Sequence, residues 1–236
     1  MTPPGVRLDL HNHTLFSADG LMSPAELLAT AGSRCVACIA ITDHNSVAGA
    51  LEAVRLADAD PTLPRVIPGI ELSTSDGEIV GLYVWETIPA GLPLLTAVER
   101  IKGQGGIVYL PHPFDRLRRG SVSSGARERA AELADIIEVV NGRSLSYRAN
   151  EKSRRLAERL GKPQGAGSDA HRLAEVGNAC IVVDAYPSRE DLVSLVARGH
   201  VVHDLTLWEY TLNWGLQGLA PVTRLRRRLA GDLARR

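Results

Sequence analysis

Short apolar segments alternate with longer amphipathic segments along most of this chain of 236 residues. The short segments are rich in valine and isoleucine and are bounded by Gly, Pro or Asp, a pattern that predicts buried strands. They are residues 6–10, 38–42, 66–70, 78–84, 107–110, 136–140, 164–167 and 178–183. The amphipathic segments, which we expect to be helices, are residues 23–31, 47–57, 92–102, 125–134, 145–160 and 189–197. The first of them begins with a capping signal, because Ser23 is followed by Pro24 and Glu26.

The regular alternation of strand and helix predicts parallel strands joined by right-handed crossovers. Seven or eight such units in about 200 residues indicate an α/β barrel related to the (β/α)8 type. We place this barrel in residues 1–187. We expect residues 188–236 to form a C-terminal helical extension packed on the barrel, ending in a helix over 222–236 with leucines opposite arginines.

Composition narrows the class of protein. With 44% apolar and 23% charged residues the chain can bury a sizeable core. The 27 basic and 27 acidic side chains cancel, which argues against a protein that coats nucleic acid through bulk charge. The three cysteines make no disulfide framework, and we expect Cys35 and Cys38 to be core residues. With no signal peptide pattern and no long apolar run, we expect a cytoplasmic protein without a membrane partner.

Polar phrases rich in histidine directly follow several predicted strands. Five of the seven histidines stand in them, and three acidic residues accompany them: one at the end of a strand, one in the loop after the first phrase and one within the last phrase. The candidate residues are His11, His13, Asp19, His44, Glu71, His112, Asp169 and His171. All strands of a parallel barrel open onto one face at their carboxyl ends, so we expect these side chains to converge there.

Imidazole and carboxylate groups together suit a borderline divalent metal ion such as Zn, Fe or Mn. His11 and His13 are two residues apart on an extended segment, so both rings point to the same side. Eight donors exceed what one ion with an open position requires. The sequence therefore predicts two or three divalent metal ions, with Glu71 as the natural bridging carboxylate.

A centre of this kind suits metal-assisted hydrolysis of a phosphate ester, because a bound ion lowers the pKa of water toward about 7. A cationic side chain should also clamp the phosphoryl oxygens, and arginine offers a bidentate fork. Arg116 and Arg143 are the candidates for substrate binding, because both stand just after predicted strands. Asp43 stands beside His44 and is a candidate for orienting an imidazole.

The ordered phrases resemble the PHP (polymerase and histidinol phosphatase) family over residues 6–185, and most of all its small stand-alone phosphoesterases. The resemblance implies a distorted (β/α)7 barrel, similar to a TIM barrel, with a bi- or trinuclear metal centre at the carboxyl ends of the strands. It also implies which candidates share an ion. His11, His13, Glu71 and Asp169 would hold one ion and carry the catalysis, Glu71 and His112 would contribute to a second, and Asp19, His44 and His171 would hold a third.

Two positions depart from what the resemblance implies. Many relatives have His where this chain has Asp19. Related small phosphoesterases often carry His at the start of the strand after the bridging glutamate, where this chain has Glu78. Either Glu78 replaces that ligand, or the second metal site is weaker or empty.

We therefore expect a phosphoesterase that hydrolyses a phosphate monoester. Its partner would be a small phosphorylated substrate such as a nucleotide, a nucleoside bisphosphate or a short oligonucleotide, with no stable nucleic-acid complex. Two alternatives stay open. One is an amidohydrolase-like enzyme, although no lysine stands at a strand end to bridge two ions. The other is a non-catalytic, metal-stabilised binding module, which the arginine-rich C-terminus favours.

Overall fold

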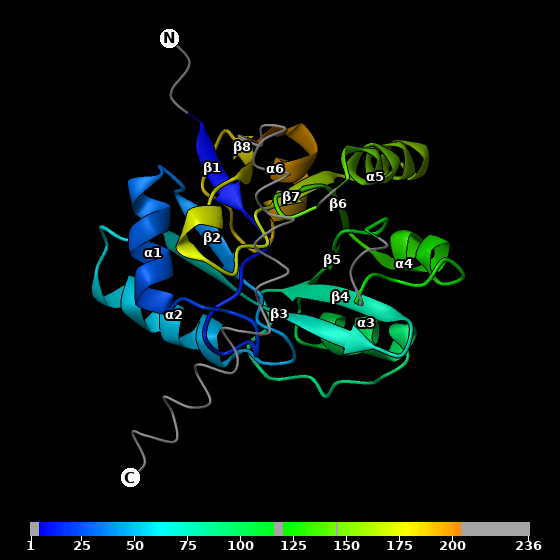
Figure 1. The fold of residues 1–236 in the computed structure, drawn as a ribbon, viewed down its shortest axis with the longest axis horizontal. Coiled ribbons are helices and arrows are strands. Elements are labelled where there is room, and N and C mark those ends of the chain that lie inside the picture. Colours follow the sequence, from blue (N-terminus) through cyan, green and yellow to red (C-terminus); the bar gives the residue numbers. More distant parts are fainter. Residues whose placement is uncertain (1–4, 116–119, 145, 204–236) are drawn as a thin grey trace.

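A computed structural model describes residues 5–115, 120–144 and 146–203, which form nine strands and six α-helices (Figure 1). The strands are β1 (Val6–Asp9), β2 (Cys38–Ile41), β3 (Arg65–Thr74), β4 (Gly77–Leu82), β5 (Ile107–Leu110), β6 (Ile136–Asn141), β7 (Gln164–Gly167), β8 (Ala179–Val183) and β9 (His200–His203). The helices are α1 (Pro24–Ser33), α2 (Ala48–Ala59), α3 (Leu94–Gly103), α4 (Arg127–Leu133), α5 (Tyr147–Leu160) and α6 (Leu192–Arg198).

The strands form one sheet that curls into a nearly closed barrel, with helices around its outside (Figure 1). The order of the strands is β7-β6-β5-β4-β3-β2-β1-β8-β9. The chain just beyond β1 lies against β7, where the Leu10 amide donates to the Ala166 carbonyl over 3.3 Å. Because the two segments meet, residues following β1 and β7 end up side by side. The predicted distorted α/β barrel is confirmed.

The strands do not all run parallel, as the alternation had predicted. β4 is antiparallel to β3 and to β5, and β8 is antiparallel to β1 and to β9. The reason for the β3–β4 pair is local. Only Ser75 and Asp76 separate the two strands, and a parallel partner needs a crossover of a dozen residues or more.

The region predicted as a C-terminal helical extension, residues 188–236, is described as far as His203. Its described part contains α6 and also β9, a strand that pairs with β8 in register Ala179↔His203 and so continues the barrel sheet. The helix expected over residues 222–236 lies outside the described residues. Among the helices that the structure describes, none is long and apolar enough to cross a membrane.

Local sequence signals account for the start of α1. The Ser23 hydroxyl accepts the Glu26 amide, and the Glu26 carboxylate accepts the Ser23 amide, which completes a capping box. The expectation for the cysteines is only half right. Cys38 is buried in β2, which raises the pKa of its thiol to about 12, whereas Cys35 is exposed in the turn after α1.

Candidate metal centre

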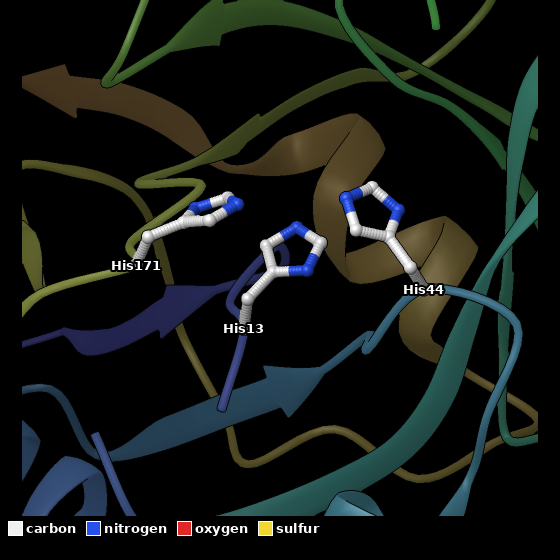
Figure 2. Close-up of side chains that lie close together, drawn as sticks. All are labelled: His13, His44 and His171. Atoms are coloured by element: carbon white, nitrogen blue, oxygen red, sulfur yellow. The ribbon is translucent and has the colours of Figure 1, made fainter. Parts of the chain in front are cut away.

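The carboxyl ends of β1, β2, β3, β5 and β7 bring all eight predicted ligand residues to one face of the barrel. His11 and His13 follow β1, and Asp19 lies in the loop that leads from β1 to α1. His44 follows β2, and Glu71 lies within β3. His112 follows β5, and Asp169 and His171 follow β7. Figure 2 shows three of the rings, with His13 between His44 and His171. Ring centroids lie 4.6 Å apart for His13 and His44 and 4.2 Å apart for His13 and His171.

The deepest group of donors contains His11, His13, Glu71 and Asp169, all buried. His11 Nε2 lies 3.2 Å from His13 Nε2 and 3.4 Å from Glu71 Oε1. His13 Nε2 lies 3.3 Å from Glu71 Oε2 and 3.3 Å from Asp169 Oδ1. Ligands on one tetrahedral ion at roughly 2.0–2.1 Å lie about 3.3 Å from one another, so this group fits a shared ion.

A second group shares the Glu71 carboxylate. Glu71 Oε1 lies 3.2 Å from His112 Nε2, and Glu71 Oε2 lies 3.2 Å from His44 Nδ1. The Glu78 carboxylate faces the same space, at 3.8 Å from His44 Nδ1 and 3.9 Å from His112 Nε2. Each oxygen of Glu71 therefore faces donors of both groups, which is the arrangement that a bridging carboxylate requires.

The third group lies at the mouth of the site. Asp19 Oδ2 lies 3.1 Å from His171 Nε2 and 3.7 Å from His44 Nε2. The side chains of Asp19 and His44 are 29% and 27% exposed, whereas the deeper donors are almost fully buried. Asp19 Oδ1 is buried and has no hydrogen-bond partner, although a buried polar atom normally has one. A cation at this position would satisfy it.

The charges of the site also fit cations. Burial by itself lowers the pKa of His11, but the negative charges of Glu71 and Glu138 outweigh it and raise the pKa to about 10. Burial likewise lowers the pKa of His44, and the charge of Glu71 and the bond to Asp19 raise it to about 9. Burial would raise the pKa of Glu71, but the charges of His11 and His44 hold it well below its usual range. The buried Glu71 carboxylate therefore stays ionised, and such a buried charge is stabilised by positive charge close to it.

Glu138 contacts two ligand candidates of the site and was not predicted from the sequence. It is buried in β6, and its carboxylate lies 3.2 Å from His11 Nδ1. The other ring nitrogen of His11 therefore faces the centre, as metal-binding histidines require. The same carboxylate accepts the Tyr109 hydroxyl at 2.9 Å and the His112 amide at 2.7 Å. The sequence does carry one indication of its role, because Glu138 is an acidic residue inside an otherwise apolar strand segment. A buried carboxylate requires hydrogen-bond or charge partners.

Asp43 orients His13 through Ser17. Asp43 accepts the Ser17 hydroxyl at 2.8 Å, and the Ser17 oxygen lies 3.2 Å from His13 Nδ1 and accepts the His44 amide. Because the hydroxyl hydrogen goes to Asp43, the Ser17 oxygen accepts from the Nδ1–H of His13. The unprotonated Nε2 of His13 is then left to face the centre. Asp43, which its place beside His44 predicted to orient an imidazole, contacts His13 through the Ser17 hydroxyl.

Two ligand candidates have strained backbones. His112 and Asp169 have φ angles of 29° and 52°, in the left-handed region that non-glycine residues rarely adopt. Such conformations persist at functional sites when surrounding contacts hold them. Here the Asp169 amide donates to the His11 carbonyl at 2.6 Å. Gly167, two residues before Asp169, lets the end of β7 lie close to the segment after β1, because an added Cβ would lie 2.3 Å from the Cβ of His11.

Of the two arginines predicted to bind substrate, Arg143 lies beside the centre. Its Nη1 contacts His171 Nδ1, and its guanidinium lies 3.9 Å from Asp169 Oδ1 and 3.8 Å from Glu175 Oε2. Burial and then the charge of Arg143 lower the pKa of His171 to about 4, so this ring is neutral, as a metal ligand must be. Arg116 lies outside the described residues.

A cavity of about 450 Å³ opens beside the second donor group. Glu78 lines it, and so do the hydroxyl-bearing residues Ser73, Thr74 and Ser121. Ser121 also lies 3.3 Å from His112 Nδ1, so the cavity adjoins the ligand candidates directly. Its size is in the range of small-molecule sites, which is roughly 300–1,000 Å³.

Comparisons with known proteins identify the class. The model of the PHP domain matches residues 9–100, and the PHP-associated model matches residues 147–201. An uncharacterized protein of Methanocaldococcus jannaschii, MJ0417, is 37% identical over 179 residues, covering 75% of this chain and 70% of that protein. The chain belongs to the PHP domain family.

Other relatives have named activities. The 5'-3' exoribonuclease Rnm of Salmonella typhimurium is 33% identical, covering 54% of this chain and 43% of that enzyme. The 3',5'-nucleoside bisphosphate phosphatase of Chromobacterium violaceum is 38% identical, covering 35% of this chain and 30% of that enzyme. The chain thus spans less than half the length of either. A two-domain protein of Bacteroides vulgatus with a predicted PHP-like metal-dependent phosphoesterase shares the fold, with a TM-score of 0.66, 15% identity and coverage of 90% of this chain and 72% of that chain.

Proposed function

We propose that this protein hydrolyses a phosphate monoester of a nucleotide, a nucleoside bisphosphate or a short oligonucleotide, with water as the nucleophile. The products would be the free alcohol and inorganic phosphate. The observation that carries the proposal is the pair of donor groups that share the buried carboxylate of Glu71 at one face of the barrel. The names of two relatives, an exoribonuclease and a nucleoside bisphosphate phosphatase, support the nucleotide class.

Two or three divalent ions, of Mn, Fe or Zn, would occupy the centre. His11, His13, Glu71 and Asp169 would hold the first, Glu71 and His112 would contribute to the second, and Asp19, His44 and His171 would hold the third. When bound, such ions supply Lewis acidity toward the phosphoryl oxygens and lower the pKa of water. Mixed imidazole and carboxylate sites accept each of these metals.

The protein's own side chains would do the remaining work. Glu138 and the Asp43–Ser17 pair keep the rings of His11 and His13 aimed at the centre. Arg143, whose guanidinium lies 3.9 Å from Asp169 Oδ1, would pair with a phosphoryl oxygen. The hydroxyl-lined cavity beside His112 would take the leaving group, since hydroxyls suit a sugar. We propose no stable complex with nucleic acid, because the net charge of the chain is zero.

The test is release of inorganic phosphate by metal-free protein reconstituted with manganese. The substrates are adenosine 3',5'-bisphosphate, mononucleotides, a short oligonucleotide and histidinol phosphate, and the blank is His13→Ala. We expect release from one nucleotide class that is lost in the blank. Metal binding without any release would refute the phosphoesterase proposal and favour the amidohydrolase-like or binding-module alternatives.

A further inference from the structure

The β3–β4 hairpin places a second carboxylate next to the bridging one. Glu71 pairs with Val80, and Ser73 pairs with Glu78, in antiparallel register. Directly opposed residues of such a pair share a face, and so do residues two apart on one strand. Glu71 and Glu78 are therefore diagonal neighbours on the face that carries the centre.

Gly120 lies directly against the Glu78 carboxylate. An added Cβ at this position would lie 1.7 Å from Glu78 Oε2 and 1.9 Å from its Cδ, so a larger residue would displace the carboxylate from its present position. The Gly120 carbonyl accepts the Glu78 amide at 2.7 Å, which fixes the two segments together. The next residue, Ser121, contacts the ring of His112. One loop thus positions both Glu78 and His112.

The distances suit a common ion. Glu71 Oε1 lies 3.2 Å from His112 Nε2, and Glu78 Oε2 lies 3.9 Å from the same nitrogen. Around an octahedral ion with ligand distances of roughly 2.1 Å, neighbouring ligands lie about 3 Å apart and opposite ones about 4.2 Å apart. Both separations fall between these values.

We propose that Glu78 is a ligand of the second metal ion, so that two carboxylates and His112 hold this ion. Carboxylate ligands suit the harder Mn²⁺ better than imidazoles do, so we infer that this position favours Zn²⁺ over Mn²⁺ less strongly than the deepest group does. The deepest group, with two imidazoles, keeps the affinity for Zn²⁺ that imidazole confers. The centre then has two positions of different metal preference. This inference rests on the metal-binding part of the proposed function and not on phosphate release.

The experiment measures metal content rather than activity. Metal-free wild type, Glu78→Gln and Glu78→His are dialysed against buffered Mn²⁺ or Zn²⁺, and bound metal is counted by mass spectrometry. At a free Mn²⁺ concentration that just saturates the wild type, we expect Glu78→Gln to lose one Mn²⁺ per chain and to bind it at least tenfold more weakly. Glu78→His should bind a full set of Zn²⁺ and shift the Mn²⁺ to Zn²⁺ preference at least tenfold toward Zn²⁺.

A second readout and two further variants secure the result. The electron paramagnetic resonance spectrum of the Mn²⁺-loaded wild type should show coupled ions, and that of Glu78→Gln should show isolated ones. Gly120→Ala keeps the carboxylate but crowds it, so we expect a loss of Mn²⁺ in the same direction. Glu86→Gln removes an exposed acid and should match the wild type.

Each outcome decides the matter. Unchanged Mn²⁺ content and spectrum in Glu78→Gln would overturn the proposal, and Glu78 would then only line the neighbouring cavity. If Glu78→Gln fails to fold, Glu78→His decides, since an unchanged metal preference in that variant also overturns the proposal. A loss of Mn²⁺ in Glu78→Gln, together with a wild type that binds Mn²⁺ but releases no phosphate, would support the ligand assignment while refuting the phosphoesterase proposal.

Discussion

Replacing Glu138 by glutamine tests whether the centre depends on an orienting carboxylate outside the ligand set. The buried carboxylate accepts four hydrogen bonds, from Tyr109, His11, His112 and Asn141. Oε1 faces the Tyr109 hydroxyl and the His11 ring, and Oε2 faces the two nitrogen donors of His112 and Asn141. Glu138→Gln keeps the size of the group but turns one oxygen into a donor, which then opposes two donors.

The magnitude follows from which oxygen is lost. A hydroxyl can rotate to accept a hydrogen bond, so the cheaper orientation places the new amide nitrogen against Tyr109 and His11. One buried donor, the His11 ring, then lacks its partner, at a cost of about 1–3 kcal/mol. The ring is also no longer aimed at the centre. Loss of such an orienting contact typically weakens metal binding about 10- to 100-fold, which corresponds to about 1.4–2.7 kcal/mol.

Two measurements separate these effects. Urea unfolding of the metal-free protein should show the loss of stability, and calorimetric titration with Mn²⁺ should show the loss of affinity. Tyr109→Phe removes one donor but leaves the carboxylate intact, so we expect a stability loss within about 1.5 kcal/mol and less than a threefold change in affinity. Glu132→Gln, on the exposed side of α4, should change neither quantity.

The reasoning is refuted if Glu138→Gln binds Mn²⁺ within threefold of the wild type. A destabilised protein with unchanged affinity would make Glu138 a purely structural residue of β6. An unchanged protein in both measurements would mean that the four hydrogen bonds do not depend on a carboxylate.

Three further outcomes are expected. Gly167→Ala should destabilise the protein by about 1–3 kcal/mol and weaken Mn²⁺ binding at least tenfold, because its Cβ collides with His11; unfolding and titration experiments check this, and an unaltered affinity would contradict it. Mn²⁺ binding should release protons and become stronger as the pH rises from 6.5 to 8.5. The reason is that His11 and His44, with pKa values of about 10 and 9, are protonated in the metal-free protein and must lose a proton to bind the ion. Calorimetry in buffers of different ionisation enthalpy measures the number of protons released. Iodoacetamide should modify one thiol of the native protein, at the exposed Cys35 and not at Cys38, as peptide mass spectrometry would show; equal labelling of both would disprove the burial argument.

The sequence by itself determined most elements and the eight ligand candidates. Strand ends such as those before His11 and His112 could be predicted because apolar periodicity and the polar phrase after it are both local signals. The convergence of these phrases followed from one rule, that strands of a barrel open onto one face at their carboxyl ends. Neither step requires knowing which strand pairs with which.

Tertiary structure alone decided whatever depends on pairing. The direction of β4, the entry of β9 into the sheet and the diagonal placement of Glu78 beside Glu71 follow from register between strands, which local pattern does not encode. Glu138 was hidden for the same reason. Its hydrogen-bond partners lie in β5, in β6 and in the segment that follows β1. The buried carboxylate is therefore satisfied only when these segments are adjacent in the folded barrel, and the apolar pattern of one strand does not show this.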